Sequence, residues 1–210
     1  MQVGIAITVV ALCMLLIAEW RGHLVGIWLA KPLASGGFLL AAMHAPGLHS
    51  TFGRSIFLAL LLSWLGDILL IPHAPIWFLC GLGSFLLAHV AYALAFLQQG
   101  VATVFTIGTS FCMTVLGVLI WRWLGERIPP PMRGAVIAYI ATISIMLTTA
   151  AGSALGSPQP GVQVAGAALF YASDIMVAKQ QFIGKKFTNK LLGLPLYYAA
   201  QLCMAQLLYF

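Results

Sequence analysis

The sequence predicts an all-α integral membrane protein, a bundle of eight transmembrane helices. The chain is 62% hydrophobic and only 7% charged over its 210 residues, whereas soluble domains carry roughly 25% charged residues. A membrane-spanning helix needs about 20 mainly apolar residues, and the sequence contains a series of such runs separated by short polar or Pro/Gly-marked breaks. We therefore expect a single transmembrane domain over residues 1–210.

The apolar runs define the spans in order. Residues 3–18 lack the basic start and the small-residue cleavage site of a signal peptide, so we interpret them as the first span. The second run, 24–43, contains Lys31 and Pro32, and the last, 191–209, is interrupted by Pro195. These interruptions leave seven spans as the alternative to eight. Such residues are tolerated in transmembrane helices when protein neighbours satisfy the polar groups. The other five runs are 52–71, 76–97, 101–123, 132–152 and 162–182.

Basic residues predict the orientation of the bundle. Eight of the ten Lys and Arg residues lie at odd-numbered connections between spans, and Arg54 lies at an even-numbered one. Because cytoplasmic loops carry the excess of Lys and Arg, we expect both termini on the non-cytoplasmic side of the cell (inner) membrane. The same distribution explains the net charge of +6 without a nucleic-acid partner.

Two aspartates in apolar runs, Asp67 and Asp174, are the first candidates for chemistry, because the chain has only four acidic residues. A charged side chain at the centre of a bilayer costs about 2.5 to 3.5 kcal/mol on insertion scales. At a helical rise of 1.5 Å per residue, Asp67 should lie about 6 to 8 Å and Asp174 roughly 10 to 12 Å from the cytoplasmic edge. Lys31 and Tyr139 fall at similar depths, so polar groups of four helices should meet in the inner half of the membrane.

The two acidic segments, 62–68 and 169–175, share the pattern Leu, any residue, large aromatic, any residue, small residue, Asp, Ile. They are four spans apart and run in the same direction, which fits either a parallel internal repeat or chance. Tyr171 lies three residues before Asp174 and shares its helical face. In the fourth span, helical spacing places His89 and Tyr92 on one stripe; such stripes usually pack in the core, and a lone buried His usually bonds a carbonyl.

A metal site is not expected. The five histidines, at 23, 44, 49, 73 and 89, include no pair at i and i+4. The four cysteines lack the C-x-x-C spacing of a metal or redox site. Neither a G-x-S-x-G elbow nor a P-loop is present. We therefore expect neither a metal nor an organic cofactor.

Several motifs resemble those of the YhhN family, over a stretch from the second span to the eighth. They are Ser-Trp-Leu-Gly-Asp-Ile-Leu-Leu at 63–70, Gly81-x-x-x-Phe85-x-x-x-His89-x-x-Tyr92, Gly-Ala-Ala-Leu-Phe-Tyr-Ala-Ser-Asp at 166–174, and Tyr197-Tyr198-Ala-Ala-Gln201. The Ala30-Lys31-Pro32-Leu33 element and Tyr139 with Met146 fit the family as well. The Gly-Asp, Ser-Asp and His-x-x-Tyr elements are the specific part of the resemblance.

The resemblance implies a lysoplasmalogenase, an ether hydrolase that acts without a metal. Such an enzyme cleaves the vinyl ether bond of lysoplasmalogens to a fatty aldehyde and glycerophosphoethanolamine or glycerophosphocholine. A vinyl ether yields to acid, because protonation of carbon gives an oxocarbenium ion that water captures. Two carboxyl groups can supply the acid, the base and the negative charge, as in glycosidases. We expect one of Asp67 and Asp174 to be protonated, with Asp174 the preferred acid, and the other to be ionised beside Lys31.

The partners expected are a lysophospholipid substrate and membrane lipids. The residues expected to orient substrate or water are Lys31, His89, Tyr92, Tyr139, Tyr171 and Tyr198. Basic residues also form a rim on the cytoplasmic side, among them Lys185, Lys186 and Arg127. Setting the membrane orientation is enough to explain them, and attracting the substrate phosphate is the alternative role. The alternatives are a proton-coupled transporter or lipid carrier, which also uses intramembrane Asp, Lys and His, and a non-catalytic scaffold in which Lys31 and an aspartate merely join helices.

Overall fold

The computed structural model describes residues 1–72 and 74–210, and within these ranges eight helices are long and apolar enough to cross a membrane. They are α1 (Gln2–Arg21), α2 (Leu24–Met43), α3 (Thr51–Leu69), α4 (Pro75–Leu97), α5 (Thr103–Leu124), α6 (Arg133–Gly152), α7 (Pro160–Phe182) and α8 (Phe187–Gln206). Short 3₁₀ helices are η1 (Pro46–His49), η2 (Gly125–Arg127), η3 (Pro130–Met132), η4 (Ala154–Gly156) and η5 (Leu207–Tyr209). The all-helical class and the eight spans are confirmed. His73, one of the five histidines weighed above as metal ligands, lies outside the described ranges.

Two helices, α1 and α8, extend by about one turn beyond the apolar runs that predicted them. The additional residues include polar ones, which an apolar run does not count. α1 continues through Glu19 to Arg21 and stops at Gly22, whose φ of 64° is the left-handed conformation that glycine adopts readily at a helix end. α8 begins at Phe187 instead of residue 191, so Asn189 and Lys190 belong to its first turn. These extensions bring charged and polar side chains into the bundle.

The two internal prolines do not divide their helices. Pro32 lies inside α2 and Pro195 inside α8, and both helices continue on either side. A proline removes one helical hydrogen bond, and neighbouring segments in a membrane bundle can satisfy the group that it frees. This continuity decides between seven and eight spans.

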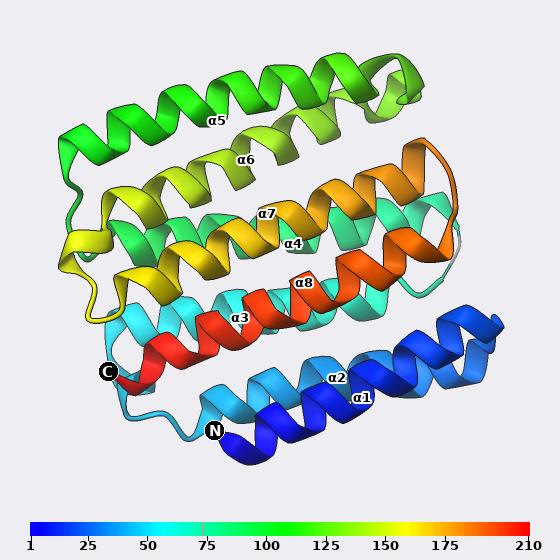
Figure 1. Ribbon diagram of the computed structural model, residues 1–210, viewed down its shortest axis with the longest axis horizontal. Helices are drawn as coiled ribbons and strands as arrows, with labels where there is room; N and C mark the ends of the chain where they lie inside the picture. The colour runs from blue at the N-terminus through cyan, green and yellow to red at the C-terminus, as the bar shows by residue number, and fades with distance from the viewer. Residues whose placement is uncertain (73) are drawn as a thin grey trace.

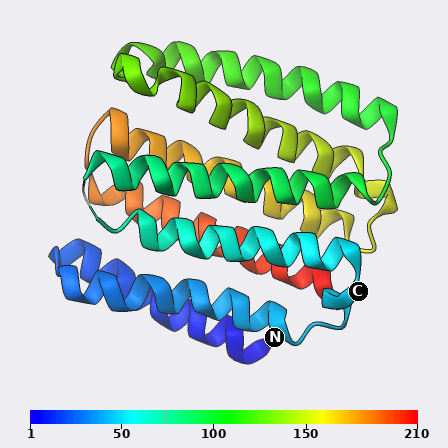
Figure 2. The same ribbon diagram turned by 180° about the vertical axis from the view of Figure 1, so that it is seen from behind.

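The helices form four sequential hairpins stacked side by side (Figure 1). The α1/α2 hairpin lies at one edge, and α5 and α6 lie at the opposite edge. Between them, α7 and α8 lie in front of α4 and α3 in Figure 1, and in the view from behind α4 and α3 lie in front (Figure 2). Both chain termini lie at the same end of the bundle, as an even number of crossings requires. The odd-numbered connections lie at the other end.

Small residues let α1 and α2 pack closely. A Cβ atom added at Gly4 would lie 2.5 Å from the backbone nitrogen of Ala41 and 2.6 Å from the carbonyl oxygen of Gly37. The Thr8 hydroxyl donates a hydrogen bond to the Ala34 carbonyl, 3.1 Å away, along the same contact. Such small-residue interfaces are typical of helix pairs in membranes.

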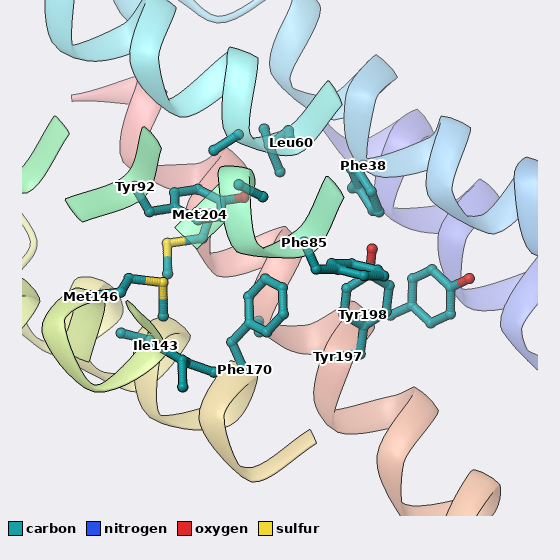
Figure 3. Close-up of a cluster of buried hydrophobic side chains, with 14 of the residues drawn as sticks. Phe38, Leu60, Phe85, Tyr92, Ile143, Met146, Phe170, Tyr197, Tyr198 and Met204 are labelled. Carbon is teal, nitrogen blue, oxygen red and sulfur yellow. The ribbon is translucent and has the colours of Figure 1, made fainter. Parts of the chain in front are cut away.

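An aromatic cluster at the centre of the bundle joins α4, α7 and α8 (Figure 3). The rings of Phe85, Phe170 and Tyr197 meet edge to face, with centroid distances of 6.2, 5.8 and 5.5 Å. The Phe170 ring also packs against His89 at 4.5 Å. Edge-to-face contacts of this kind stabilise the packing of aromatic rings, so the cluster supports the polar groups beside it.

Candidate active site

A cavity of about 240 Å³ contains both candidate aspartates in its wall. Asp67 from α3 and Asp174 from α7 line it together with Lys31 from α2 and Tyr139 from α6. The wall also includes residues beside all four odd-numbered connections, namely Glu19, Leu70, Leu124 and Phe182. The cavity therefore lies in the half of the bundle that carries these connections, where the sequence placed the polar layer.

Asp67 is surrounded by donors from two other helices. Its Oδ1 lies 3.4 Å from the Lys31 Nζ, and its Oδ2 accepts hydrogen bonds from the Ser35 hydroxyl at 2.5 Å and the Tyr197 hydroxyl at 2.7 Å. Its side chain is only 4% exposed. The ammonium and the two hydroxyl donors each favour negative charge on the Asp67 oxygens.

Helical spacing explains how these donors meet Asp67. Lys31 and Ser35 are four residues apart on α2 and therefore project from the same face. On α8, the Tyr198 hydroxyl lies 3.3 Å from the Ser35 hydroxyl and donates to the Lys31 carbonyl at 3.4 Å. Tyr197 and Tyr198 thus connect α8 to both α2 and α3 and hold the Asp67 network in place.

Asp174 has different surroundings. Its Oδ2 accepts a hydrogen bond from the Tyr139 hydroxyl at 2.8 Å and lies 3.5 Å from the His89 Nε2. Among the described residues no Lys or Arg forms an ion pair with it, and neither ring nitrogen of His89 has a hydrogen-bond partner. The Asp174 side chain is 14% exposed, more than that of Asp67. Asp174 is therefore the more accessible carboxyl group and the less surrounded by donors.

The remaining predicted site residues separate into two groups. Tyr171 lines the cavity, and its hydroxyl lies 3.3 Å from the Ser144 hydroxyl. His89, Tyr92 and Tyr198 are fully buried and are absent from the cavity wall that the described residues form. The Tyr92 hydroxyl donates to the Gln201 Oε1 at 2.7 Å. His89 lies beside Asp174 but not at the cavity wall. Tyr92 connects α4 to α8, and Tyr198 connects α8 to α2.

Two hydrogen-bond donors of the site, Ser35 and Tyr197, were not predicted. Tyr197 was visible in the Tyr197-Tyr198 motif, but the sequence does not show which of two adjacent tyrosines faces Asp67. Ser35 lies one helical turn after Lys31, and that spacing was the available signal. A second ion pair in the wall, between Lys190 and Glu19, was also missed, because both residues lie outside the predicted apolar runs.

The expected phosphate residues lie elsewhere. Lys185, Lys186 and Arg127 are exposed and do not contribute to the described cavity wall, whereas Lys190 does. The Arg127 guanidinium donates to the Trp123 carbonyl at 2.5 Å. Within the described ranges, no group of three or more His, Cys, Asp or Glu side chains could hold a metal ion. The groups assembled here are those of acid–base chemistry.

Comparisons with known proteins identify the family to which the chain is similar. The YhhN family model matches residues 26–208. A lysoplasmalogenase of Mycobacterium bovis is 33% identical over 207 residues, which cover 93% of this chain and 74% of that protein. Lysoplasmalogenase TMEM86A of Bos taurus is 30% identical over 184 residues, covering 85% of this chain and 72% of that protein. The human protein of the same name is 31% identical over 184 residues.

No solved structure matches the chain significantly. The family match includes α3, α4, α7 and α8, which carry the motifs around Asp67, His89, Asp174 and Tyr197. It thus spans every helix that contributes a partner to either aspartate. Because the family model matches residues 26–208 and a relative is 33% identical over 207 residues, the chain belongs to the YhhN family.

Proposed function

We propose that this protein is a lysoplasmalogenase that hydrolyses the vinyl ether bond of a lysophospholipid by acid–base catalysis. Family membership and the names of the relatives support an enzyme of this type. The observation that carries the mechanism is that Asp67 and Asp174 line one cavity. Two carboxyl groups on one substrate site are the arrangement by which glycosidases act through an oxocarbenium ion.

In this mechanism Asp67 is the base. Lys31, Ser35 and Tyr197 stabilise its negative charge and hold the carboxylate in one orientation. The carboxylate would activate a water molecule and also stabilise the positive charge that develops on the substrate. Asp67 requires all three neighbours for this role, because an isolated carboxylate in a protein interior is strongly disfavoured.

Asp174 is the acid. The Tyr139 hydroxyl donates a hydrogen bond to the Asp174 Oδ2, and the Asp174 side chain lines the cavity. The absence of a Lys or Arg partner among the described residues suits a carboxyl group that carries a proton before the reaction. His89, 3.5 Å behind it, would act as a positioning residue that limits how the carboxyl group rotates.

The catalytic cycle closes without other reactants. Asp174 transfers its proton to the double-bond carbon distant from the ether oxygen, and the other carbon becomes an oxocarbenium centre. Asp67 takes a proton from water as the water oxygen bonds to that centre, which gives a hemiacetal. The bond between that carbon and the glycerol oxygen then breaks, while Asp67 protonates the glycerol oxygen and Asp174 receives the hemiacetal hydroxyl proton. Both carboxyl groups return to their starting states, and the products are a fatty aldehyde and a glycerophosphodiester.

The rest of the wall suits the hydrocarbon tail. Apolar side chains at the cavity include Phe78, Leu82, Ile140 and Leu194. They would hold the alkenyl chain and limit the access of bulk water, so that the oxocarbenium ion meets the water activated by Asp67. The water-soluble product that the family resemblance implies is glycerophosphoethanolamine or glycerophosphocholine, released together with the aldehyde.

The test uses purified protein in detergent, supplied with a lysoplasmalogen in D₂O. Because the first step protonates carbon, the aldehyde trapped by borohydride reduction should carry one deuterium on the carbon next to the former carbonyl. Aldehyde released without that deuterium would contradict carbon protonation. Absence of turnover in detergent, with substrate movement across sealed vesicles under a proton gradient, would instead identify a carrier.

The orientation also remains a proposal: the odd-numbered connections face the cytoplasm of the cell (inner) membrane. Single-cysteine variants in a protein without its four native cysteines test it. In spheroplasts, an impermeant maleimide should label Leu155→Cys, in η4 between α6 and α7, and spare Lys185→Cys, between α7 and α8. The reverse labelling pattern would invert the topology.

A further inference from the structure

A second ion pair lies in the wall of the same cavity. Lys190, in the first turn of α8, pairs with Glu19, near the end of α1. Their side chains are 32% and 12% exposed, and both line the cavity that contains Asp67 and Asp174. Three of the four acidic residues in the chain, all except Glu126, thus surround one cavity.

We propose that Glu19 and Lys190 form the headgroup subsite, which binds the zwitterionic phosphate-and-ammonium head of the substrate. Lys190 would bind the phosphate, and Glu19 would bind the ammonium. This inference rests on the proposed function and identifies the part of the substrate that the two aspartates do not contact. It places the phosphate at Lys190 instead of the exposed rim of Lys185, Lys186 and Arg127.

The positions along the helices fit one substrate molecule. Tyr197, which bonds Asp67, follows Lys190 by seven residues on α8, a distance of roughly 10 Å along the helix at 1.5 Å per residue. In a lysoplasmalogen, glycerol and a phosphodiester separate the vinyl ether from the ammonium. A molecule lying along α8 would therefore place its reacting bond near the aspartates and its head near Lys190.

Polar side chains around Lys190 support a site for a charged head. Gln180, Gln181 and Asn189 also line this part of the cavity. The Asn189 Nδ2 donates to the Gln180 Oε1 at 2.9 Å and to the Gly184 carbonyl at 2.8 Å. These bonds connect the first turn of α8 to the end of α7 and restrict the position of Lys190.

The chemistry of an ion pair explains the expected selectivity. A zwitterionic head presents an anion to Lys190 and a cation to Glu19, so both protein charges exchange one partner for another. A head with phosphate alone would occupy Lys190 but leave the Glu19 carboxylate without a cation, which is unfavourable for a partly buried charge. Lys190 should therefore favour any phosphate-bearing substrate, and Glu19 should favour those that also carry an ammonium.

The experiment compares three substrates with the same alkenyl chain: one with an ethanolamine phosphate head, one with phosphate alone, and alkenylglycerol without a head. Lys190→Met should lower the kcat/KM ratio of either phosphate-bearing substrate to alkenylglycerol by about tenfold or more. Glu19→Gln should lower the ratio of the ethanolamine to the phosphate-only substrate by a similar factor. Matched controls are Lys179→Met and Glu126→Gln, which lie outside the described cavity wall and should leave every ratio unchanged.

Equal losses on all three substrates would overturn the inference and assign the pair to holding α1 against α8. Binding measurements separate this result from a failure of the proposed function. Wild-type protein should bind an alkyl ether lysophosphoethanolamine, which has no vinyl ether to cleave, and Glu19→Gln should bind it about tenfold more weakly. If the wild type binds it but cleaves none of the three substrates, the proposed function fails and the subsite stands; equal affinities of wild type and variant would refute the subsite.

Discussion

Asp67 and Asp174 occupy equivalent places in two similar heptapeptides, yet their surroundings differ. Asp67 has Lys31, Ser35 and Tyr197 as partners, from α2 and α8. Asp174 has one hydroxyl donor, Tyr139 of α6, and a histidine at 3.5 Å. The same local pattern therefore places a carboxyl group on the inner face of each helix, while neighbouring helices decide how many donors it meets.

This difference suits the proposed roles of the two carboxyl groups as acid and base. Two carboxyl groups in identical surroundings would compete for the same protonation state, whereas different surroundings separate an acid from a base. The aromatic cluster connects the surroundings of the two aspartates. The Phe170 ring packs against His89, which lies beside Asp174, and against Tyr197, whose hydroxyl donates to Asp67. The two networks are distinct but pack against the same aromatic cluster.

The largest expected effect is the loss of either carboxyl group. Asp67→Asn and Asp174→Asn keep the size of the side chain but remove the base or the acid, and each should lower the rate of aldehyde release by about 10²- to 10⁴-fold. Gel filtration in detergent should confirm that each variant stays folded. Wild-type turnover by either variant would remove that residue from the mechanism and end the comparison.

Removal of the cation tests the claim that Asp67 is held as a carboxylate. Lys31→Met leaves a buried charge without its partner and should lower the free energy of unfolding by about 3 to 5 kcal/mol, along with activity. The double variant Lys31→Met/Asp67→Asn should regain much of that stability while remaining inactive. Thermal unfolding in detergent measures both, and an unstable double variant would contradict the pairing.

The hydroxyl donors distinguish the two sites more finely. Tyr139→Phe and Tyr197→Phe each remove one hydrogen bond to a carboxyl group, worth about 1.5 to 3 kcal/mol if the group is charged and about 1 kcal/mol if it is neutral. We therefore expect Tyr197→Phe, beside Asp67, to destabilise the protein more than Tyr139→Phe, beside Asp174. Equal or reversed changes in unfolding free energy would show that the assignment of acid and base is wrong.

The smallest effect is expected at Tyr92, which the sequence suggested for substrate binding. Its hydroxyl bonds Gln201 away from the cavity, so Tyr92→Phe should destabilise the protein by about 1 kcal/mol and change kcat/KM by no more than a few-fold. The matched variant Tyr171→Phe, at the cavity wall, provides the comparison. If Tyr92→Phe lost as much activity as the aspartate variants, Tyr92 would have to be counted as a substrate-binding residue.

The all-helical membrane class, the eight spans and the two candidate aspartates could be predicted from the sequence, because apolar length, helical period and the rarity of intramembrane charge are local properties. The sequence also placed Lys31 and Tyr139 in the same membrane layer. The three-dimensional arrangement was needed to show which carboxyl group pairs with Lys31, which of the adjacent Tyr197 and Tyr198 bonds Asp67, and that Glu19 pairs with Lys190. These outcomes depend on how each helix is rotated against its neighbours, which is set by packing among residues far apart in the chain.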